Sequence, residues 1–585
     1  MQRIASNRER ARPPPVASAL KRAFAKGYGP TELRADLLAG IVVGIVALPL
    51  SMALAIGVGV PPQHGLYTAI VAGITVALLG GCKFQVTGPT AAFIVILAPV
   101  VTQYGLSGLL TAGFLAGILL VGMGVARLGR LIQFIPHPVT TGFTTGIATV
   151  IATLQIKDVL GLELGPMPEH YTDKLAALWT ARASASGSEF LVAATTFALL
   201  LLIPRFIRRI PAPLIALSAV SVACVLAARL WPGVAVATIG SRFQTTIEGV
   251  TVSGIPPMMP LPSLPWGNGF SFQLVRELLP AAFAIAMLGA IESLLSAVIA
   301  DGMTGTRHDP DAELVGLGIG NLLAPIFGGI AATGALARTA TNIRAGARSP
   351  LAAVTHSIVV LLSILVLAPL VAYVPMASLA ALLLLVAWNM SDMHGFVGVV
   401  KVAPKSDVTV LLTCFALTVL FDMVIAVSVG VVLAAILFMK RMAELTEIRT
   451  SLENSSESPD LALPSGVALY EVNGPLFFGA AQRAMETIHG ANSDSYEVMI
   501  LHLGKVPVID GTGLVALDNA IGALMRRKKK VVIAGPLPRP RSVFDRARLE
   551  HKHPGLVFSE SLAAAIGQAE QFSVARTIRT APHAG

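Results

Sequence analysis

From about residue 36 to residue 440 the chain is a succession of apolar stretches separated by short breaks, and this pattern limits what it can fold into. Only 13% of the 585 residues are charged, against about 25% in soluble domains. A bilayer, rather than a large soluble core, accommodates such a chain. The basic residues behind the net charge of +10 are scattered along the sequence, so the pattern excludes a nucleic-acid-binding protein.

The apolar stretches predict fourteen membrane segments, because a full crossing takes about 20 apolar residues. We expect them at 36–58, 64–81, 90–104, 107–126, 132–153, 189–204, 212–230, 277–299, 312–327, 338–348, 351–372, 375–391, 406–421 and 423–440. The third and the tenth segments are too short to cross a bilayer alone. The sequence therefore predicts two broken spans within an even number of segments.

The charges of the loops indicate how these segments are oriented. If the N-terminus is cytoplasmic, the short basic loops fall on the cytoplasmic side, as the positive-inside rule requires. These loops carry Arg127/Arg130, Arg205/Arg208/Arg209, Arg307, Arg348, Lys401/Lys405 and Lys440/Arg441. We therefore expect a multi-pass protein of a bacterial inner membrane, in contact with lipid, with both termini in the cytoplasm.

The composition changes along the chain and divides it into five regions. We expect a basic, proline-rich cytoplasmic tail at 1–35, a transmembrane transporter domain at 36–440, a polar linker at 441–465, a small α/β domain at 466–572 and a tail at 573–585. Cys82, Cys224 and Cys414 lie inside apolar runs without metal-binding spacing. We expect no metal and no cofactor.

An internal repeat points to a transporter. Residues 64–92 and 312–340 both read as an apolar helix that ends in Gly-Gly, a short extended stretch containing Thr-Gly, and a new helix. Seven spans separate the two copies, an odd number, so the halves have opposite topology. Inverted repeats with broken helices are typical of secondary transporters.

The broken helices are the predicted substrate site, because two half-helix N-termini near the midplane would present free N–H groups and positive dipole ends to an anion. Gly88-Pro89 suits a helix start, and Thr339, Thr341 and Asn342 can cap the second half-helix. Leu50 and Leu54, after Pro49, are candidate pocket walls. The predicted substrate-binding residues are Leu50, Leu54, Gly88, Pro89, Thr90, Ala91, Ala337, Arg338 and Thr339.

Two ionisable side chains inside the apolar region need a partner or a function. An arginine at bilayer depth costs at least about 2.5 kcal/mol, so Arg338 either binds an anion or pairs with a carboxylate. Glu292 is a lone carboxyl group in an apolar helix and could carry a proton, with Ser296 one turn further on the same face. The alternative for Glu292 is a structural, permanently protonated or Arg338-paired residue.

Coupling of some kind is expected on energetic grounds. Moving a dianion inward against 100 mV costs about 4.6 kcal/mol. An importer of dianions must therefore bring in protons or sodium, or exchange anions.

In the soluble domain we expect strands that start at Val467, Pro475, Val498 and Val531, with a helix after the Pro475 strand. The stretch from Asp510 to Leu514 follows the strand that starts at Val498. It resembles the signature of the STAS (sulfate transporter and anti-sigma antagonist) domain, in which the position of Thr512 is a phosphorylatable serine. The resemblance makes Asp510 and Thr512 regulatory candidates and a cytosolic protein a candidate partner. The residues themselves favour a helix N-cap at this place.

The whole chain from about residue 26 to residue 572 resembles the sulfate permease family of anion transporters. The resemblance rests on PPQHGLYTA (61–69), VTGPTAAF (86–93), MLGAIESLL (287–295), DGMTGT (301–306), TGALARTATNIRAGARSP (333–350), LFDMVIAVSVG (420–430) and PLFFGAA (475–481). Within the family it looks most similar to the bacterial C4-dicarboxylate permeases, which take up succinate, fumarate and aspartate with protons.

The resemblance implies an α-helical membrane fold of fourteen segments in a seven-plus-seven inverted repeat. It also implies core and gate domains, an elevator-like motion and a homodimer. Family members that transport bicarbonate have an Asp and a Thr at the positions of Glu292 and Ser296 to bind sodium, so the residues here favour protons. An arginine near the anion site of related motor proteins matches Arg338.

Several functions remain open at this stage. The first is proton-coupled uptake of C4-dicarboxylates, and its alternative is a symporter or exchanger for sulfate or bicarbonate. A nucleobase permease of the same fold is disfavoured, because a neutral base needs no fixed cation such as Arg338. A membrane sensor that binds anions without moving them is the third hypothesis, and no motif supports an enzyme.

Overall fold

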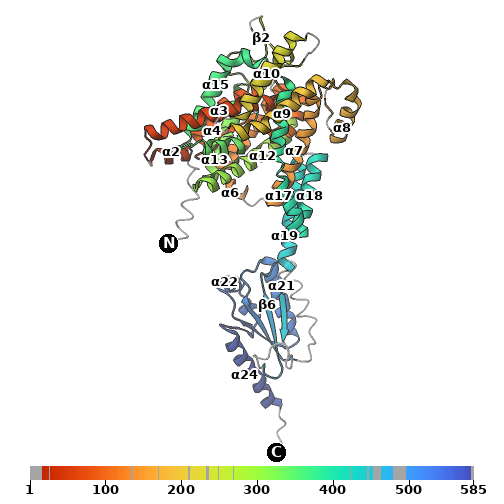
Figure 1. Ribbon diagram of the computed structural model, residues 1–585. Coiled ribbons are helices and arrows are strands. Elements are labelled where there is room, and N and C mark those ends of the chain that lie inside the picture. Colours follow the sequence, from red (N-terminus) through yellow and green to blue (C-terminus); the bar gives the residue numbers. More distant parts are fainter. Residues whose placement is uncertain are drawn as a thin grey trace, which may run out of the picture. The chain divides into compact units, whose positions relative to one another are not determined.

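The computed structural model describes residues 16–25, 27–132, 136–165, 167–168, 170–207, 211–231, 236–247, 250–267, 269, 271–421, 423–444, 447–451, 463–477 and 496–580. The chain forms two compact units, residues 1–431 and 432–585. The first is built almost wholly of helices, and the second is a mixed α/β domain (Figure 1).

The helices of the first unit follow one another with short connections. They are α2 (Ser18–Ala25), α3 (Pro30–Val58), α4 (Pro62–Leu79), η1 (Ala91–Phe93), α5 (Ile94–Val125), α6 (Gly129–Ile132), α7 (His137–Val159), α8 (Tyr171–Thr180), η2 (Ala181–Ser184), α9 (Gly187–Phe206), α10 (Ala212–Leu230), α11 (Ile239–Arg242), α12 (Phe272–Thr304), α13 (Pro310–Ile326), α14 (Leu336–Arg344), α15 (Leu351–Val371), α16 (Met376–Met390), α17 (Met393–Val402), α18 (Lys405–Leu420) and α19 (Met423–Glu444). Two antiparallel pairs of strands accompany them: β1 (Thr87–Gly88) with β4 (Thr333–Gly334), and β2 (Gln244–Ile247) with β3 (Val250–Ser253).

The predicted membrane segments correspond to these helices. Within the described residues, ten helical stretches are long and apolar enough to cross a bilayer. One of them, α5, is interrupted at Gly105, where φ is 65° and ψ is −169°, so it holds the third and fourth predicted segments. The shorter α13, α14 and α18 supply the remaining three of the fourteen.

Some boundaries differ from the prediction. The first long helix begins at Pro30 instead of residue 36, because Gly29 and Glu32 form an N-terminal capping arrangement there. The expected tail contains α2, and the expected loops contain α8, α11, α17 and the β2–β3 hairpin. These elements are too short or too polar to stand out from a hydropathy pattern.

The helices pack into two groups that mix the two halves of the sequence. In the first group, α5 packs against α12 and α13, and α15 packs against α3 and α4. In the second, α7 packs against α16 and α18, and α9 packs against α10 and α16. The groups contain the helices expected for a core and a gate domain.

Glycines allow the closest of these helix contacts. A Cβ atom on Gly117 of α5 would lie 2.7 Å from the amide nitrogen of Leu322, and one on Gly318 of α13 would lie 2.6 Å from that of Val121. Small residues at such crossings are the usual means of helix association in lipid, where dispersion contacts replace the hydrophobic effect.

The two extended stretches of the sequence repeats meet inside the first group of helices. Each stretch, together with the half-helix that follows it, is called an arm below: the first arm contains β1 and η1, and the second contains β4 and α14. Thr87 pairs with Gly334, and Gly88 pairs with Thr333, in an antiparallel register. All four residues are buried. The pairing joins the two sequence repeats. Each extended stretch supplies hydrogen-bond partners for backbone groups of the other, which have no partner in a helix.

The predicted helix start at Gly88-Pro89 is wrong. Thr90 is the N-cap, with extended φ and ψ of −127° and 158°, and the helical turn begins at Ala91. Gly88 is held in β1 by its pairing with Thr333, and the chain stays extended through Thr90. Gly88 is therefore part of β1, and Pro89 belongs to the extended connection.

The expected caps of the second half-helix also act differently. The N-cap of α14 is Ala335, which has no side-chain acceptor. Thr339 Oγ1 instead accepts a hydrogen bond from the Val86 amide at 3.1 Å, and Asn342 Nδ2 donates to Phe84 O at 2.9 Å. These side chains hold the opposite arm rather than their own helix end.

Buried polar groups of α13 fix both arms. Glu313 is fully buried, and its Oε2 accepts hydrogen bonds from the amides of Gly81 and Cys82, both at 2.8 Å, while its Oε1 accepts one from Gln85 Nε2 at 2.8 Å. Asn321, two turns further along α13, bonds both the N–H and the C=O of Ala332 at 2.8 and 2.9 Å. A single helix thus positions the chain before β1 and before β4.

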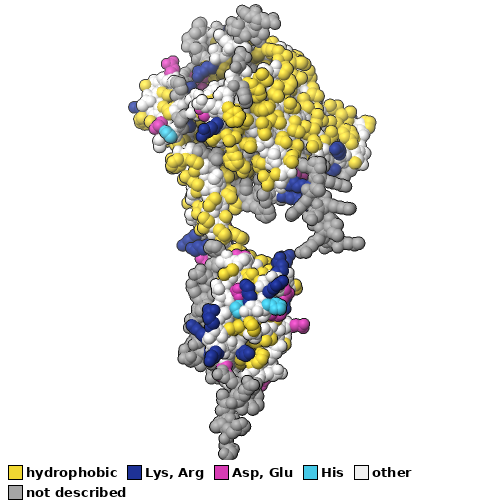
Figure 2. All heavy atoms as spheres, turned by 180° about the vertical axis from the view of Figure 1, so that it is seen from behind, with side chains coloured by type: hydrophobic (Ala, Val, Ile, Leu, Met, Phe, Trp, Pro, Cys, Tyr) yellow, Lys and Arg dark blue, Asp and Glu magenta, His cyan; other side chains and the backbone are white. Residues whose placement is uncertain are grey.

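The surface of the helical unit is suited to lipid. Figure 2 shows hydrophobic side chains covering most of the visible face of this unit, whereas charged side chains are scattered over the C-terminal unit. Phe190 and Leu191 of α9 and Leu230 of α10 are 54%, 66% and 69% exposed. This arrangement is typical of a membrane-embedded domain.

The C-terminal unit contains a five-stranded sheet in the order β5-β6-β7-β8-β9. Its elements are β5 (Glu447–Ser451), β6 (Val467–Asn473), β7 (Val498–Lys505), α21 (Gly511–Arg526), β8 (Lys530–Ala534), α22 (Pro538–Arg546), α23 (Leu549–Lys552), β9 (Leu556–Ser559) and α24 (Leu562–Thr580). Strands β6 to β9 are parallel, and β5 is antiparallel to β6. The buried residues of α21 pack on one face of the sheet, and Ala565 and Ala569 of α24 pack on the other.

Three expectations for this unit need correction. The predicted linker 441–465 contains β5, which reads as a linker because an edge strand with one apolar residue has no hydrophobic pattern. The strand expected from Pro475 is reduced to an isolated bridge between Leu476 and Ile509. Helix α24 continues to Thr580, into the expected tail. The helix expected after Pro475 falls mainly on residues outside the described ones.

Replacing Glu313 tests how strongly the arm before β1 depends on one side chain. Glu313→Ala leaves three donors without their acceptor, each worth about 1–3 kcal/mol when buried, so we expect a large fall in the thermal unfolding temperature of the detergent-solubilised protein. Glu313→Gln is the matched control. It should lose much less, because Gln85 Oε1, which has no hydrogen-bond partner among the described residues, can turn toward the new amide. Equal losses in the two variants would contradict this account.

Candidate functional site

Arg338 lies beside the place where β1 pairs with β4, which is called the crossing below. It is in the first turn of α14 and only 2% exposed. Its Nη2 donates a hydrogen bond to the carbonyl oxygen of Pro89, on the opposite arm. The sequence prediction of a cation at the start of the second half-helix is confirmed.

The remaining nitrogens of this guanidinium group are not satisfied within the protein. Among the described residues, Arg338 Nε and Nη1 have no hydrogen-bond partner, and no carboxylate oxygen lies within 4 Å of the group. Glu292 is close enough to interact with the charge of Arg338, but buried donors without an acceptor are still costly. Arg338 Nε and Nη1 can each donate a hydrogen bond to a bound acceptor, and the guanidinium group carries a full positive charge. Such a group can bind an anion.

Glu292 is the carboxyl group that faces this region. It lies in the middle of α12, is partly exposed, and its Oε2 accepts a hydrogen bond from Thr90 Oγ1 at 2.8 Å. Thr90 is the N-cap residue before η1. The predicted proton-coupling residue is thus tied directly to the start of the first half-helix, and it forms no ion pair with Arg338 in the described structure.

Ser296 acts on the other half-helix. It is fully buried, and its hydroxyl group donates to Thr339 Oγ1 at 3.3 Å, which in turn accepts from the Val86 amide. Ser296 therefore links α12 to α14, and within the described residues it forms no hydrogen bond with the Glu292 carboxyl group. Helix α12 supports both half-helices, one through each residue.

The structure brings most of the other predicted site residues to the same crossing. Gly88 lies against the Arg338 guanidinium, where a Cβ atom would collide with Nη1. Ala91 begins η1, and Ala337 precedes Arg338 in α14. The carbonyl oxygen of Pro89 and the hydroxyl group of Thr90 have the roles given above.

Leu50 and Leu54 lie in α3, just after Pro49. Leu54 is 1% exposed, and Leu50 is partly exposed. Helix α3 packs against α5, α14 and α16, so both residues are on an element next to the crossing. Their role as pocket walls stays a prediction.

Sequence reasoning missed the polar residues that support the arms. Gln85 Nε2 donates to Ser293 Oγ at 2.6 Å as well as to Glu313. One signal was available, since Glu313 is an acidic residue inside an apolar helix, as Glu292 is. Gln85 and Ser293 have no such signal, because their importance depends on a partner more than 200 residues away.

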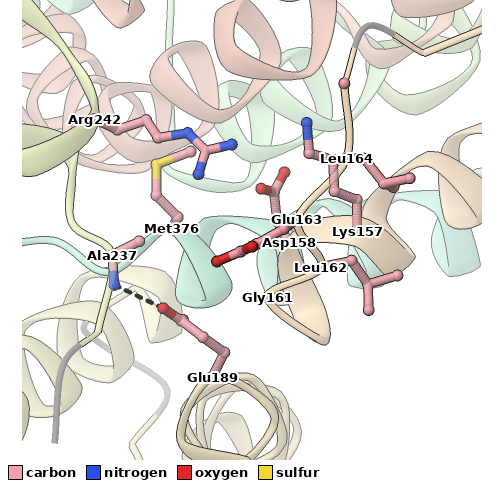
Figure 3. Close-up of a pocket in the computed structure, with 11 residues that line it drawn as sticks. Lys157, Asp158, Gly161, Leu162, Glu163, Leu164, Glu189, Ala237, Arg242 and Met376 are labelled. Carbon is pink, nitrogen blue, oxygen red and sulfur yellow. Dashed lines mark hydrogen bonds between the residues drawn. The ribbon is translucent and has the colours of Figure 1, made fainter. Parts of the chain in front are cut away.

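A cavity of about 590 Å³ lies elsewhere, at the end of α7 and the start of α9. Figure 3 shows Asp158, Glu163 and Arg242 around it, with Glu189 hydrogen bonded to the Ala237 amide at 2.6 Å. It shares no residue with the β1–β4 crossing, and its charges are mixed. The buried Arg338 therefore lies outside this cavity, at the β1–β4 crossing.

In the C-terminal unit, the N-cap interpretation of Asp510 is confirmed. Its Oδ1 accepts a hydrogen bond from the Gly513 amide at 2.7 Å at the start of α21. Thr512 is exposed in the first turn of the helix. The regulatory role of these two residues stays a prediction.

The inverted pair of broken helices and the buried cation between them define a membrane transporter rather than an enzyme. A model of the sulfate permease family matches residues 33–415, and a STAS domain model matches residues 458–565. The chain belongs to the sulfate permease family and carries a C-terminal STAS domain.

Named relatives cover nearly the whole chain. It is 41% identical over 530 residues to the putative sulfate transporter YvdB of Bacillus subtilis, with 90% of this chain and 96% of the relative aligned. It is 29% identical over 543 residues to the bicarbonate transporter BicA of Picosynechococcus, with 89% and 92% aligned.

Solved structures share the fold. The murine Slc26a9 anion transporter in the inward-facing state matches with a TM-score of 0.81 over 95% of this chain and 94% of that chain, at 18% identity. The transmembrane domain of a cyanobacterial bicarbonate transporter BicA matches with a TM-score of 0.58 over 70% and 98%, at 27% identity. At 18% identity the first match shows the fold alone.

The predicted likeness to C4-dicarboxylate permeases in particular is not supported by these relatives. Those that align over most of the chain are named for sulfate and bicarbonate. The motifs that suggested dicarboxylates, around Glu292 and in residues 301–306, belong to α12 and the turn after it.

Gly88 offers a local test of the site. Gly88→Ala places a methyl group against the Arg338 guanidinium, which must move, so we expect anion uptake by proteoliposomes to fall about tenfold or more while the protein stays folded. Gly122→Ala in α5 is the control, since nothing lies within 4 Å of its added Cβ atom. Unchanged uptake in Gly88→Ala would show that the position of Arg338 does not matter.

Proposed function

We propose that this protein is a secondary active transporter of small inorganic oxyanions, with sulfate as the main substrate and bicarbonate as the second candidate. The observation that carries the proposal is the buried Arg338 guanidinium with two unpaired nitrogens at the crossing of β1 and β4. The name of the relative that is 41% identical favours sulfate.

The site suits a compact oxyanion. Arg338 can donate from Nε and from Nη1, which have no partner among the described residues, and a charged guanidinium group is well suited to bind oxyanions. The N-caps of both half-helices provide no side-chain acceptor for their first amides, so these amides and the helix dipoles add to the positive potential.

We propose that Glu292 couples transport to protons. A proton on this carboxyl group removes a negative charge beside the anion, and its loss places one there. One proton carried on Glu292 with each sulfate would reduce the cost of moving the dianion inward against 100 mV from about 4.6 to about 2.3 kcal/mol. The hydrogen bond from Thr90 gives the carboxyl group a direct connection to the first half-helix.

The wider arrangement follows from the same proposal. The core helices that hold both arms would move as one body relative to the gate helices, in an elevator-like cycle. The basic loops favour cytoplasmic N- and C-termini. A homodimer and a cytosolic partner of the STAS domain remain predictions.

Removal of the cation tests the substrate site. In proteoliposomes, Arg338→Gln should reduce uptake of labelled sulfate about 10- to 100-fold, because a charge-assisted hydrogen bond is worth about 1.5–3 kcal/mol. Arg344→Gln, an exposed arginine of the same helix, is the control and should transport normally. The proposal fails if both variants transport alike.

Removal of the ionisable carboxyl group tests coupling. Glu292→Gln still accepts the hydrogen bond from Thr90, so we expect sulfate exchange across the vesicle membrane to persist while accumulation driven by an inward pH gradient is lost. Glu277→Gln, near the start of α12, is the matched control. Full pH-driven accumulation in Glu292→Gln would overturn the assignment.

The substrate class is decided by competition. Uptake of labelled sulfate should be inhibited by excess sulfate and much less by excess succinate, under an imposed pH gradient or an imposed sodium gradient. If bicarbonate alone is taken up, the second candidate is correct. If succinate is taken up and sulfate is not, the inorganic-anion proposal is wrong.

A further inference from the structure

The N-terminal helix α2 packs on the end of α4, just before the first arm. Ala17 N donates to Leu79 O at 2.8 Å, and Arg22 Nη2 donates to Gly81 O at 2.8 Å. These carbonyl groups lie at the C-terminal end of α4, where a helix leaves acceptors without partners. The amide of the same Gly81 is bound by Glu313. The helix α2 thus contacts the chain leading to β1 directly.

The residues after α2 reach the second arm. The rings of Phe24 and Tyr28 are 5.2 Å apart, and Tyr28 Oη donates to Asp36 Oδ2 at 2.8 Å. Asp36 is fully buried and accepts hydrogen bonds from the amide and the hydroxyl group of Ser349, in the turn between α14 and α15. One short segment is therefore connected to the start of one arm and to the end of the other.

The two faces of α2 differ. Ser18, Ala19 and Ala23 are buried against the protein, whereas Lys21 and Phe24 are exposed, Phe24 by 51%. Residues 16–25 contain two basic and no acidic side chains, and the preceding fifteen residues contain four arginines and one glutamate. A short helix with a cation and an aromatic ring on its free face, four residues before a membrane span, suits a membrane–water interface.

We propose that the outer face of α2 docks on anionic lipid headgroups at the membrane surface where the N-terminus lies, and that this contact stabilises both arms of the anion site. Lys21 provides the charge and Phe24 the apolar contact. The hydrogen bond from Arg22 to Gly81 O connects α2 to the first arm. The contact of the Phe24 ring with Tyr28, and the hydrogen bond from Tyr28 to Asp36, connect α2 to the second arm. Loss of the headgroups would loosen residues 79–84 and 345–350 together.

Amide hydrogen exchange of the full chain in lipid nanodiscs tests this without any transport assay. The probes are nanodiscs of zwitterionic phosphatidylcholine alone and nanodiscs that also contain phosphatidylglycerol. Each cation near an anionic surface is worth about 1 kcal/mol, or about fivefold. We expect exchange at 79–84 and 345–350 to be about fivefold slower in the anionic nanodiscs for the wild type.

Three variants separate the outer face from the inner one. Lys21→Gln combined with Phe24→Ser should exchange at the same rate in both lipids. Arg22→Gln should speed exchange at 79–84 in both lipids and leave 345–350 unchanged. Lys401→Gln, an exposed lysine of α17, should retain the full lipid effect. Protection of α12 in the same data verifies that each variant is folded.

Two results would overturn the proposal. One is equal exchange of the wild type in the two lipids, a comparison that needs no variant to fold. The other is a lipid effect that survives the Lys21/Phe24 double substitution. Neither depends on which anion the protein transports, so this proposal and the proposed function can fail separately.

Discussion

Two stretches of extended backbone lie inside a domain that is otherwise helical, and their polar groups must find partners within the protein. The antiparallel pairing of Thr87–Gly88 with Thr333–Gly334 meets part of this demand. Glu313, Asn321, Thr339 and Asn342 meet more of it through side chains. Because partners come from the other half of the sequence, neither arm can be built without the other. The proposed anion site lies where the two arms depend on each other.

The crossing also explains why a buried arginine is tolerated. Arg338 uses one nitrogen to bind Pro89 O and so ties the two arms together, while the rest of the guanidinium group is left for a ligand. A structural arginine would be fully satisfied by the protein, since unpaired buried donors are costly. Glu292 accepts a hydrogen bond from Thr90, at the start of the first half-helix. In the proposed mechanism, anion binding and proton coupling would therefore involve the same few residues.

Several elements around the crossing hold the two arms in place. Helix α13 holds the chain before each arm, and α12 supports the half-helices through Glu292 and Ser296. Beyond these, α2 and Asp36 contact the outer ends of both arms. The moving parts of a transporter need such supports, because a loose first half-helix would lose the alignment of Thr90 with Glu292. The two membrane arms are thus connected to residues near the surface of the domain.

The sequence alone determined the membrane segments, the inverted repeat, the α/β domain and the importance of Arg338 and Glu292, because hydropathy and a costly charge in an apolar run are visible without coordinates. It misplaced the start of the first half-helix at Gly88-Pro89 and concealed β5 in an apparent linker. It gave no sign of Gln85, Ser293 or the contact of Arg22 with Gly81. The contacts of Gln85, Ser293 and Arg22 were decided by the tertiary structure, since each is a hydrogen bond between groups far apart in the chain. A pattern within one segment can show that a polar group needs a partner, but only the fold shows which partner it has.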